Sequence, residues 1–346
     1  MIRDLEDRVS CIHLGDNLLI AGDWSGGLKA WNRDGDLLWS YSGPDRVSSL
    51  VSHKMGYLAT MGLDLVALDS DGCEMWRHRL EGSADEAMVD GDGIIHATSS
   101  VFDIEHGDFM ESAHWCFSMD GELQRVERFD ERPWFMGREG DVVILGLGRP
   151  RCGMLSSTDD GMEWSTLADD DPVSCGIQGR TGVLFGHARG SISKVKQGGV
   201  QHVLTHDSGI SNIICTPGGF AILDEEKKIY SFDPDGESLG FYQSTSATEV
   251  IDSFTPSTGD GAIWSCNERV LVALSTECIP LLRLNMASTI TSIAAHRDMI
   301  CVGLENGQVQ TFQREMLVRR MEAEQEQNTS KDSRQSLRDR LRRLRD

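Results

Sequence analysis

The sequence predicts an all-β protein, an eight-bladed β-propeller followed by a basic α-helical tail. One hairpin motif occurs twice, as Ala30–Trp39 and Ala67–Trp76, and its second turn glycine, Gly72, follows the first, Gly35, by 37 residues. Glycine supplies the positive φ that a tight turn requires, and a repeat period near 40 residues is typical of propellers and related arrays. Because such a ring buries one continuous core, we expect residues 1–320 to form one domain and residues 321–346 to form a polar linker and a basic amphipathic helix. A seven-bladed ring is the alternative.

Four short strands are expected in every repeat. Each unit opens with two apolar stretches, as in Val9–Leu14 and Leu18–Gly22, and closes with the hairpin. Short strands separated by regularly spaced turn signals are the pattern of a propeller blade, and helical periodicity is absent before the tail. The turn glycine recurs at Gly121, Gly161, Gly199 and Gly236 and is lost from the last two hairpins. This register places the starts of the eight blades near residues 9, 44, 83, 132, 171, 209, 247 and 288.

The eighth blade can obtain its outermost strand in two ways. Either Met316–Val318 folds back on Gln308–Phe312, or Met1–Leu5 pairs with that segment and leaves Met316–Gln327 to form a helix. The sequence does not decide between them.

One unit is longer than the others and predicts a functional loop. The step from Gly72 to Gly121 is 49 residues, and the excess falls at Phe102–Ser112, between the second and third strands of blade three. In a propeller these loops share a face with the connections between blades, and loops on a rigid scaffold commonly carry function. His106 and Phe109 of this insertion are therefore candidate partner-binding residues.

Other turns on the same face carry further candidates. Trp24 lies in the glycine-rich turn Gly22–Gly27, where a large exposed aromatic residue is a candidate contact anchor. The equivalent turns of blades four and five carry Arg149, Arg151, His187 and Arg189. Their arginines are candidates for a cationic spot that grips a carboxylate or phosphate, although ordinary solvated loop charge is the favoured interpretation. The tryptophans at matched repeat positions are instead expected to pack between blades: Trp31, Trp39, Trp76 and Trp164.

Composition excludes several classes of function. No apolar run approaches the roughly 20 residues of a membrane span, and a net charge of −22 argues against general DNA binding. The acidic N-terminal residues do not resemble a signal peptide, and nine cysteines without a CxxC pair indicate reduced thiols, so we expect a cytoplasmic protein. No cofactor and no metal site are expected. Cys11 and His13 would be the candidate ligands of a zinc site, but buried core thiols explain the cysteines better.

The segment Leu19–Trp31, continuing to Trp39, resembles the PQQ-like β-propeller repeat, which is similar to the WD repeat. In that repeat an Ala-x-Asp-x-x-Gly turn precedes a tryptophan that docks between adjacent blades. The resemblance implies a propeller but not an activity, since the family includes quinone-dependent alcohol dehydrogenases and an outer-membrane assembly lipoprotein. This chain has neither the adjacent cysteines of those dehydrogenases nor a lipid-attachment cysteine behind an apolar leader. We therefore expect a cytoplasmic member of the family that holds no quinone.

The C-terminal segment differs in charge from the rest of the chain. From Asn328 onward seven basic residues accompany three acidic ones, whereas residues 1–327 contain 26 basic and 52 acidic residues. Ser333 is a candidate N-cap of an amphipathic helix that would contact an anionic partner, an acidic protein, RNA, anionic lipid or the body of the protein itself. A flexible tail without a target is the alternative. The expected contact residues are Leu337, Arg338, Leu341, Arg342, Leu344 and Arg345.

No catalytic constellation is recognisable in the sequence, so the leading hypothesis is a non-catalytic protein-interaction scaffold that uses the loop-bearing face. Two alternatives remain open. One is a hydrolase or lyase with its active site at the central channel, where residues from several blades converge without a local motif. The other is an RNA- or ribonucleoprotein-associated factor anchored by the arginine-rich helix. The sequence identifies no partner and no substrate.

Overall fold

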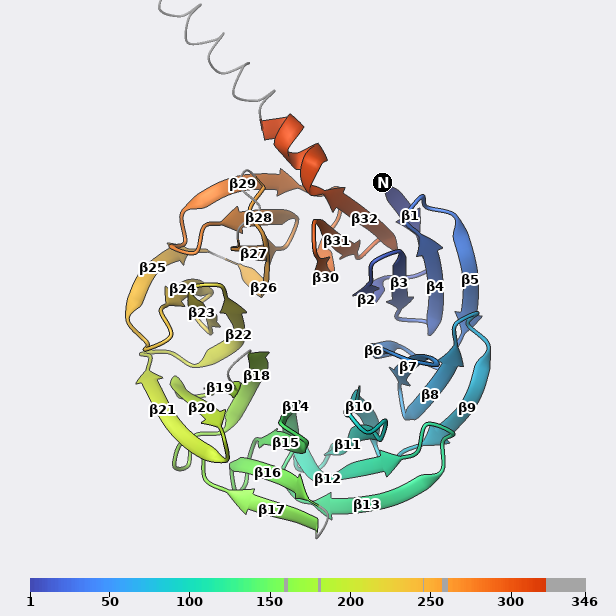
Figure 1. Ribbon diagram of the computed structural model, residues 1–346, viewed down its shortest axis with the longest axis vertical. Helices are drawn as coiled ribbons and strands as arrows, with labels where there is room; N and C mark the ends of the chain where they lie inside the picture. The colour runs from blue at the N-terminus through green and yellow to red at the C-terminus, as the bar shows by residue number, and fades with distance from the viewer. Residues whose placement is uncertain (159–160, 180–181, 245, 257–260, 322–346) are drawn as a thin grey trace, which may run out of the picture.

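Eight four-stranded antiparallel sheets surround a common axis in the computed structural model, which describes residues 1–158, 161–179, 182–244, 246–256 and 261–321 (Figure 1). Blades one to four contain β2 (Val9–Leu14), β3 (Leu18–Asp23), β4 (Gly27–Asn32) and β5 (Leu37–Ser42); β6 (Val47–His53), β7 (Gly56–Met61), β8 (Asp64–Asp69) and β9 (Glu74–Arg79); β10 (Ser83–Val89), β11 (Ile95–Asp103), β12 (Asp108–Phe117) and β13 (Leu123–Phe129); and β14 (Pro133–Glu139), β15 (Val142–Leu147), β16 (Gly153–Thr158) and β17 (Gly161–Ser165).

Blades five to eight repeat this arrangement. They contain β18 (Val173–Gly179), β19 (Gly182–His187), β20 (Ser191–Lys196) and β21 (Gly199–Thr205); β22 (Ile210–Thr216), β23 (Gly219–Asp224), β24 (Lys228–Phe232) and β25 (Ser238–Gln243); β26 (Ala247–Phe254), β27 (Gly261–Asn267), β28 (Val270–Leu274) and β29 (Pro280–Asn285); and β30 (Ile290–His296), β31 (Met299–Leu304), β32 (Gln308–Gln313) and β1 (Ile2–Asp4). The first strand of each blade lies nearest the axis and the fourth lies at the rim (Figure 1). The eight-bladed prediction is confirmed, each blade beginning within three residues of its predicted start, and the seven-bladed alternative is wrong.

The two ends of the chain close the ring in the eighth blade. β1 pairs antiparallel with β32, and its flanking residues extend the pairing through Leu5 N–H to Gly307 O and Thr311 N–H to Met1 O. Because β31 occupies the other edge of β32, no edge remains for a further strand. The possibility that Met316–Val318 forms this strand is therefore wrong. Residues 314–321 form a helix, and its Leu317 packs into the core between blades seven and eight.

The hydrophobic core lies between neighbouring blades. Trp39 of blade one lies against Gly72 of blade two, where an added Cβ would come within 2.5 Å of the indole ring. Trp76 of blade two packs on Gly121 of blade three in the same way and donates its Nε1–H to Met119 O. Both glycines have positive φ, so these positions require glycine for conformation and for space. The repeated glycine and tryptophan are thus two halves of one contact between blades.

A β-bulge marks the beginning of the first strand in every blade. The extra residue is serine or threonine in six blades, and in several of them its hydroxyl donates to a carbonyl of the second strand, as Ser211 does to Leu223 O at 2.9 Å. Blades three and four depart from this rule, since Asp85 and Glu86 lie in the bulge of β10 and Trp134 lies in that of β14. The six regular positions are Ser10, Ser48, Ser174, Ser211, Thr248 and Thr291.

The predicted tail lies beyond the last described residue, 321. The expected linker and the expected contacts of the tail therefore fall outside the described residues, namely Leu337, Arg338, Leu341, Arg342, Leu344 and Arg345. Within residues 1–321, apart from the omitted positions, no helix is long and apolar enough to cross a membrane.

Ring closure predicts that two leucines near the first blade contribute unequally to the free energy of unfolding. Leu5 is buried in the core between blades eight and one, whereas Leu38 is exposed on β5. Leu5→Ala is expected to lower the free energy of unfolding by about 2–3 kcal/mol, because it leaves a cavity at the closure. Leu38→Ala is expected to change it by less than about 0.5 kcal/mol. Urea unfolding of both variants measures the difference, and equal effects would contradict the closure described above.

Candidate functional site

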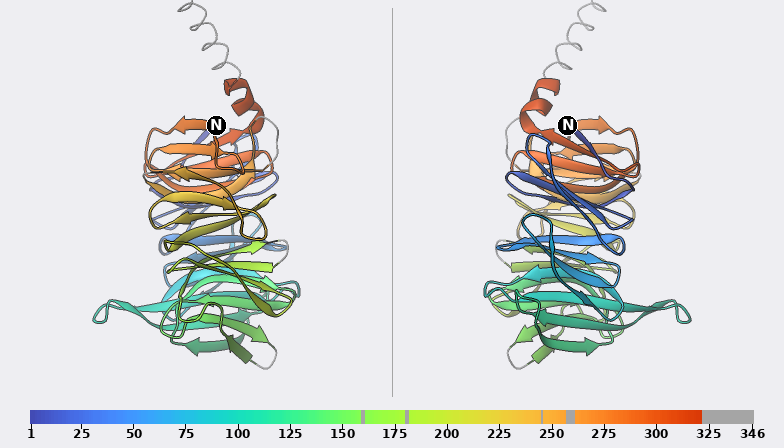
Figure 2. Two further views of the ribbon diagram at one scale, coloured as in Figure 1. Left: turned by 90° about the vertical axis from the view of Figure 1, so that its left-hand side faces the viewer. Right: turned by 90° about the vertical axis from the view of Figure 1, so that its right-hand side faces the viewer.

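A long β-hairpin projects from one face of the ring. The third blade's β11 and β12 extend beyond the neighbouring strands, and Figure 2 shows the hairpin standing out along the ring axis. We call this face, which carries the turns between second and third strands, the hairpin face. The predicted insertion is thus a paired extension of two strands, in register from Ile95 to Asp103 with one irregularity after Val101. Its tip exposes apolar side chains, with Ile104 at 89% and Phe102 at 50% of full exposure.

Phe109, on β12 of this hairpin, lies in an aromatic cluster. The guanidinium carbon of Arg132 lies 3.7 Å from the ring centre of Phe109 and 4.2 Å from that of Trp134. Phe109 also meets Phe102 edge-on, with ring centres 5.1 Å apart. We call Phe109, Arg132 and Trp134 the Arg132 stack. A cation held against aromatic faces gives such a cluster a fixed geometry.

The departure from the bulge rule explains why the Arg132 stack forms here. The bulge in β14 directs Trp134 outward, where it is 45% exposed and lies against Gly148 of the β15–β16 turn. Asp85, in the bulge of β10, lies 3.6 Å from Arg132 Nη2 and accepts hydrogen bonds from Ser83 and Ser100. The two irregular bulges therefore supply both the aromatic surface and the carboxylate that anchors the cation.

His106 lies at the tip of the hairpin and is exposed. Its Nδ1 lies 3.0 Å from Asp103 Oδ2, and the Asp103 carboxylate also accepts the backbone N–H groups of Glu105 and His106. These bonds lower the pKa of Asp103, with the side chain of His106 as the largest cause. His106 therefore helps to order the turn that presents Ile104.

Trp24 occupies the corresponding turn of blade one. The guanidinium carbons of Arg46 and Arg8 lie 4.1 and 4.7 Å from its ring centre, and the side chain remains 40% exposed. Trp24 thus forms a second cation-aromatic cluster, between blades one and two. The structure does not bring it together with Phe109, which lies between blades three and four.

The structure places the candidate residues of the cationic spot, on blades four and five, in three different environments. His187 is fully buried, with Nδ1 near Asp171 O and Nε2 near Ser193 Oγ, so it is not available to a partner and the prediction for it is wrong. The charges of Arg149 and Arg189 both act on the Cys152 thiol, and so do those of Asp170 and Asp171. Two carboxylates therefore accompany the arginines and offset their charge. Arg151 covers Trp164, with its guanidinium carbon 3.9 Å from the ring centre.

Two carboxyl groups on the innermost strands have strongly shifted pKa values. Burial raises the pKa of Glu86 on β10 to about 7, although Met136 N–H donates to its Oε2. Burial also raises the pKa of Glu249 on β26 to about 7. These residues belong to blades three and seven, on opposite sides of the ring (Figure 1). Glu86 and Glu249 therefore do not belong to one convergent set of catalytic groups.

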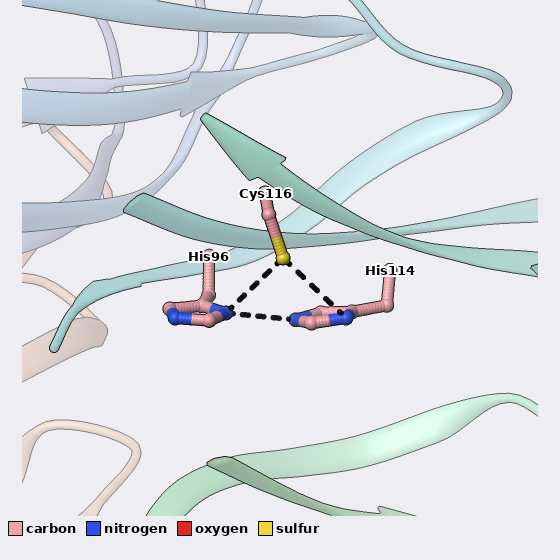
Figure 3. A group of neighbouring side chains, drawn as sticks. All are labelled: His96, His114 and Cys116. Carbon is pink, nitrogen blue, oxygen red and sulfur yellow. Dashed lines mark hydrogen bonds between the residues drawn. The ribbon is translucent and has the colours of Figure 1, made fainter. Parts of the chain in front are cut away.

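A compact group of two histidines and a cysteine lies near the opposite face, in the same blade as the hairpin. His96 Nδ1 lies 3.1 Å from His114 Nε2 and 3.6 Å from Cys116 Sγ, and Figure 3 shows the sulfur above the two rings. All three side chains are buried. Within the part of the chain that the structure describes, this is the one group of at least three His, Cys, Asp and Glu residues close enough to share a metal ion.

Neither this group nor Arg132 and Trp134 of the Arg132 stack is among the residues predicted from the sequence. His114 and Cys116 have the same spacing as Cys11 and His13 and are an equal signal for a metal site. The third member, His96, is brought in by the pairing of β11 with β12, which sequence spacing alone does not specify. Cys11 and His13 belong to no such group among the described residues. Trp134 could have been noticed as the one aromatic residue at a position otherwise occupied by serine, threonine or an acid.

No protein-family model matches the chain, and no curated protein sequence matches it. Solved structures share its fold. BamB from Moraxella catarrhalis is 14% identical, with a TM-score of 0.71 over 90% of this chain and 96% of BamB. Sqt1 from Saccharomyces cerevisiae is 10% identical and the C-terminal WD40 domain of Sif2 is 9% identical, each with a TM-score of 0.71 over 90% of this chain and 97% of the other. At these identities the likeness shows the propeller fold alone, and it supports a β-propeller repeat class in general.

The raised pKa of Glu86 predicts that the stability of the protein depends on pH. Its pKa is about 7 in the folded protein against an ordinary value of 4.5, so the folded state binds the extra proton between these values. Glu86 therefore lowers stability as pH rises from about 4.5 to about 7, and its full penalty is present above that range. Glu86→Gln keeps an acceptor for Met136 N–H and removes the charge. We expect it to stabilise the protein by about 1–2 kcal/mol at pH 8 and by far less at pH 5.

Urea unfolding at the two pH values tests this expectation, with the exposed Glu122→Gln as the control. A gain for Glu86→Gln that is the same at both pH values would contradict the burial of an ionised carboxylate.

Proposed function

We propose that this protein is a non-catalytic interaction scaffold whose protein partner binds the hairpin face over blades three and four. The observation that carries the proposal is the Arg132 stack, whose Trp134 is exposed, beside an exposed apolar hairpin tip, in the two blades whose bulges lack serine or threonine. A repeat that is regular elsewhere has no structural need for these side chains. Their exposure is therefore best explained by a contact with another protein.

The apolar tip supports this proposal because exposed large side chains are gathered there. Phe102, Ile104 and Met110 are all exposed on one hairpin, beside the half-exposed Trp134. Aromatic residues, methionine and arginine are the side chains enriched at the centres of protein interfaces. Bringing such a patch into a partner's surface removes apolar area from water without breaking any contact within the ring.

The side chains of the Arg132 stack and the hairpin tip are already held in place, which also supports binding. Arg132 is fixed by Asp85 and by two aromatic rings, and the turn at the tip is held by Asp103. Side chains that are already ordered lose less conformational entropy when a partner binds. The patch is therefore suited to specific recognition rather than to loose association.

Charge defines the chemistry of the partner. The hairpin carries Asp103, Glu105, Asp108 and Glu111 around its apolar side chains, and Arg132 is already paired with Asp85. An apolar segment flanked by lysine or arginine residues complements this surface. We propose that the complex forms in the cytoplasm, and the nine unpaired thiols support a reducing compartment.

The partner can be identified by site-specific photo-crosslinking in the native cell. A photoreactive phenylalanine analogue replaces Ile104 in one chain and Phe241 in another, since Phe241 is similarly exposed on the rim strand β25. We expect one protein to be crosslinked from position 104 and not from position 241. Purified partner then measures the effect of Ile104→Asp, which should weaken binding at least tenfold because it places a charge in the apolar contact.

Phe241→Asp serves as the matched control and should leave the affinity unchanged. Equal crosslinking from both positions, or equal affinities for Ile104→Asp and the wild type, would reject the hairpin face as the binding surface.

A further inference from the structure

The strand register gathers three metal-ligating side chains on one face of blade three. Residues two apart in a strand point to the same side, so His114 and Cys116 share a face of β12. Pairing with β11 places His96 directly opposite Cys116. The three side chains therefore meet by sheet geometry, on the side of the blade that faces blade four.

The spacing of their donor atoms fits a single metal ion. Nitrogen and sulfur atoms bound tetrahedrally to one Zn²⁺ at ordinary bond lengths lie about 3.3–3.6 Å apart. The separation is 3.1 Å between the two nitrogens and 3.6 Å between His96 Nδ1 and Cys116 Sγ, and one donor atom from each residue lies within 4.8 Å of the others. Because the two ring nitrogens face each other in nearly parallel rings and the sulfur lies 4.0 Å from His114 Nδ1, both rings have to turn for their lone pairs to meet at one ion.

Asp90 fixes the protonation of His96 in the form that a metal requires. Its Oδ2 lies 3.2 Å from His96 Nε2, so this carboxylate accepts the Nε2 proton and leaves the Nδ1 lone pair directed at the other two side chains. A carboxylate that accepts the second ring proton of a ligating histidine is a recurrent feature of zinc sites. The Oδ1 atom of Asp90 is bound by the N–H groups of Asp92 and Ile94, which hold the carboxylate in place.

Two charged side chains, Arg125 and Glu127, lie beside the cluster. Arg125 Nη2 lies 3.9 Å from Cys116 Sγ, where its positive charge favours the thiolate but opposes a bound cation, while Glu127 Oε2 lies 4.0 Å from Arg125 Nε and offsets part of that charge.

The cluster borders a cavity of about 570 Å³ between blades three and four. Its walls include His96, Cys116, Asp90, Asp141 and Arg125. Metal can therefore enter from this side, and a fourth coordination position there can hold water or an anionic ligand.

We propose that His96 Nδ1, His114 Nε2 and Cys116 Sγ bind one zinc ion, with the fourth position open to the cavity. Binding releases the thiol proton of Cys116 to solvent, and the ring proton that His114 Nε2 donates to His96 Nδ1 moves to His114 Nδ1. The site lies near the face opposite the hairpin, so it is independent of the proposed partner-binding surface.

The same residues are less suited to thiol catalysis. Cys116, His96 and Asp90 follow one another as a nucleophile, a base and an orienting acid would. However, burial raises the pKa of the Cys116 thiol, and His114 Nε2 occupies the position facing His96 Nδ1. A reactive cysteine needs a lowered pKa and access to substrate.

Metal titration of the folded chain tests the proposal. The protein is stripped with a chelator, its fold is checked by circular dichroism, and it is titrated with Co²⁺ and then Zn²⁺. We expect one Co²⁺ per chain, with the near-ultraviolet band of a thiolate ligand and the visible bands of tetrahedral cobalt, and displacement by one Zn²⁺. Bound Zn²⁺ should also raise the melting temperature, because the ion binds only the folded state.

Variants distinguish this site from the other thiols. Cys116→Ser should abolish the thiolate band, while Cys11→Ser, at the same spacing from a histidine, should retain it. Asp90→Asn keeps an oxygen for the N–H groups of Asp92 and Ile94 but offers an amide to His96 Nε2, which moves the ring proton to Nδ1. Zn²⁺ affinity should then fall about 10–100-fold in a protein that remains folded.

Absence of the cobalt bands in folded wild-type protein would overturn the proposal, and so would bands that survive Cys116→Ser. Rapid carboxymethylation of Cys116 in a chain that binds no Zn²⁺ would likewise overturn it and assign the cluster to thiol chemistry.

Discussion

The pairing of β1 with β32 is the constraint on which the rest of the structure depends. Each blade buries its faces only against its two neighbours, so an open array would leave two apolar faces in water. The N-terminal strand completes the last blade and thereby joins the first residues of the chain to its end. Closure removes those exposed faces, and the local contacts between blades, such as Trp39 on Gly72, then add around the whole ring.

A closed ring allows local departures without loss of the fold. Blade three carries three of them, which are the long hairpin, the acidic bulge at Asp85 and Glu86, and the histidine-cysteine cluster. Blade four adds Trp134. The hairpin and the Arg132 stack lie on one face, whereas the cluster lies near the other, so the proposed partner surface and the proposed metal site are on opposite faces of one pair of blades.

The fold could be predicted from the sequence because matched motifs at a regular spacing reveal the length of the repeat. The contact between Trp39 and Gly72 joins residues of the two matched motifs. The blade boundaries follow from the spacing of these motifs. The outer strand of blade eight could not be chosen, because pairing between chain ends leaves no local signal. The segment Met316–Val318 is apolar for another reason, since its Leu317 is buried as part of a helix.

The candidate sites could be predicted only where a loop or an unusual residue marks them. The insertion and Phe109 were found because the repeat lengthens there. Arg132, Trp134 and His96 were not found, because their partners are set by bulges and cross-strand register rather than by distance along the chain. His187 was misplaced for the opposite reason, since a turn position predicts exposure, but its ring is buried by bonds to Asp171 and Ser193.

The central claim is that the ring is a scaffold and that the departures in blade three carry the function. The most direct measurement removes the hairpin tip and asks what is lost. Val101 and Glu111 face each other across the hairpin, so residues 102–110 can be replaced by an Asn-Gly turn. The account predicts a melting temperature within about 2 °C of the wild type and loss of binding to the partner crosslinked at Ile104. Retained binding, or a ring that no longer folds, would contradict it.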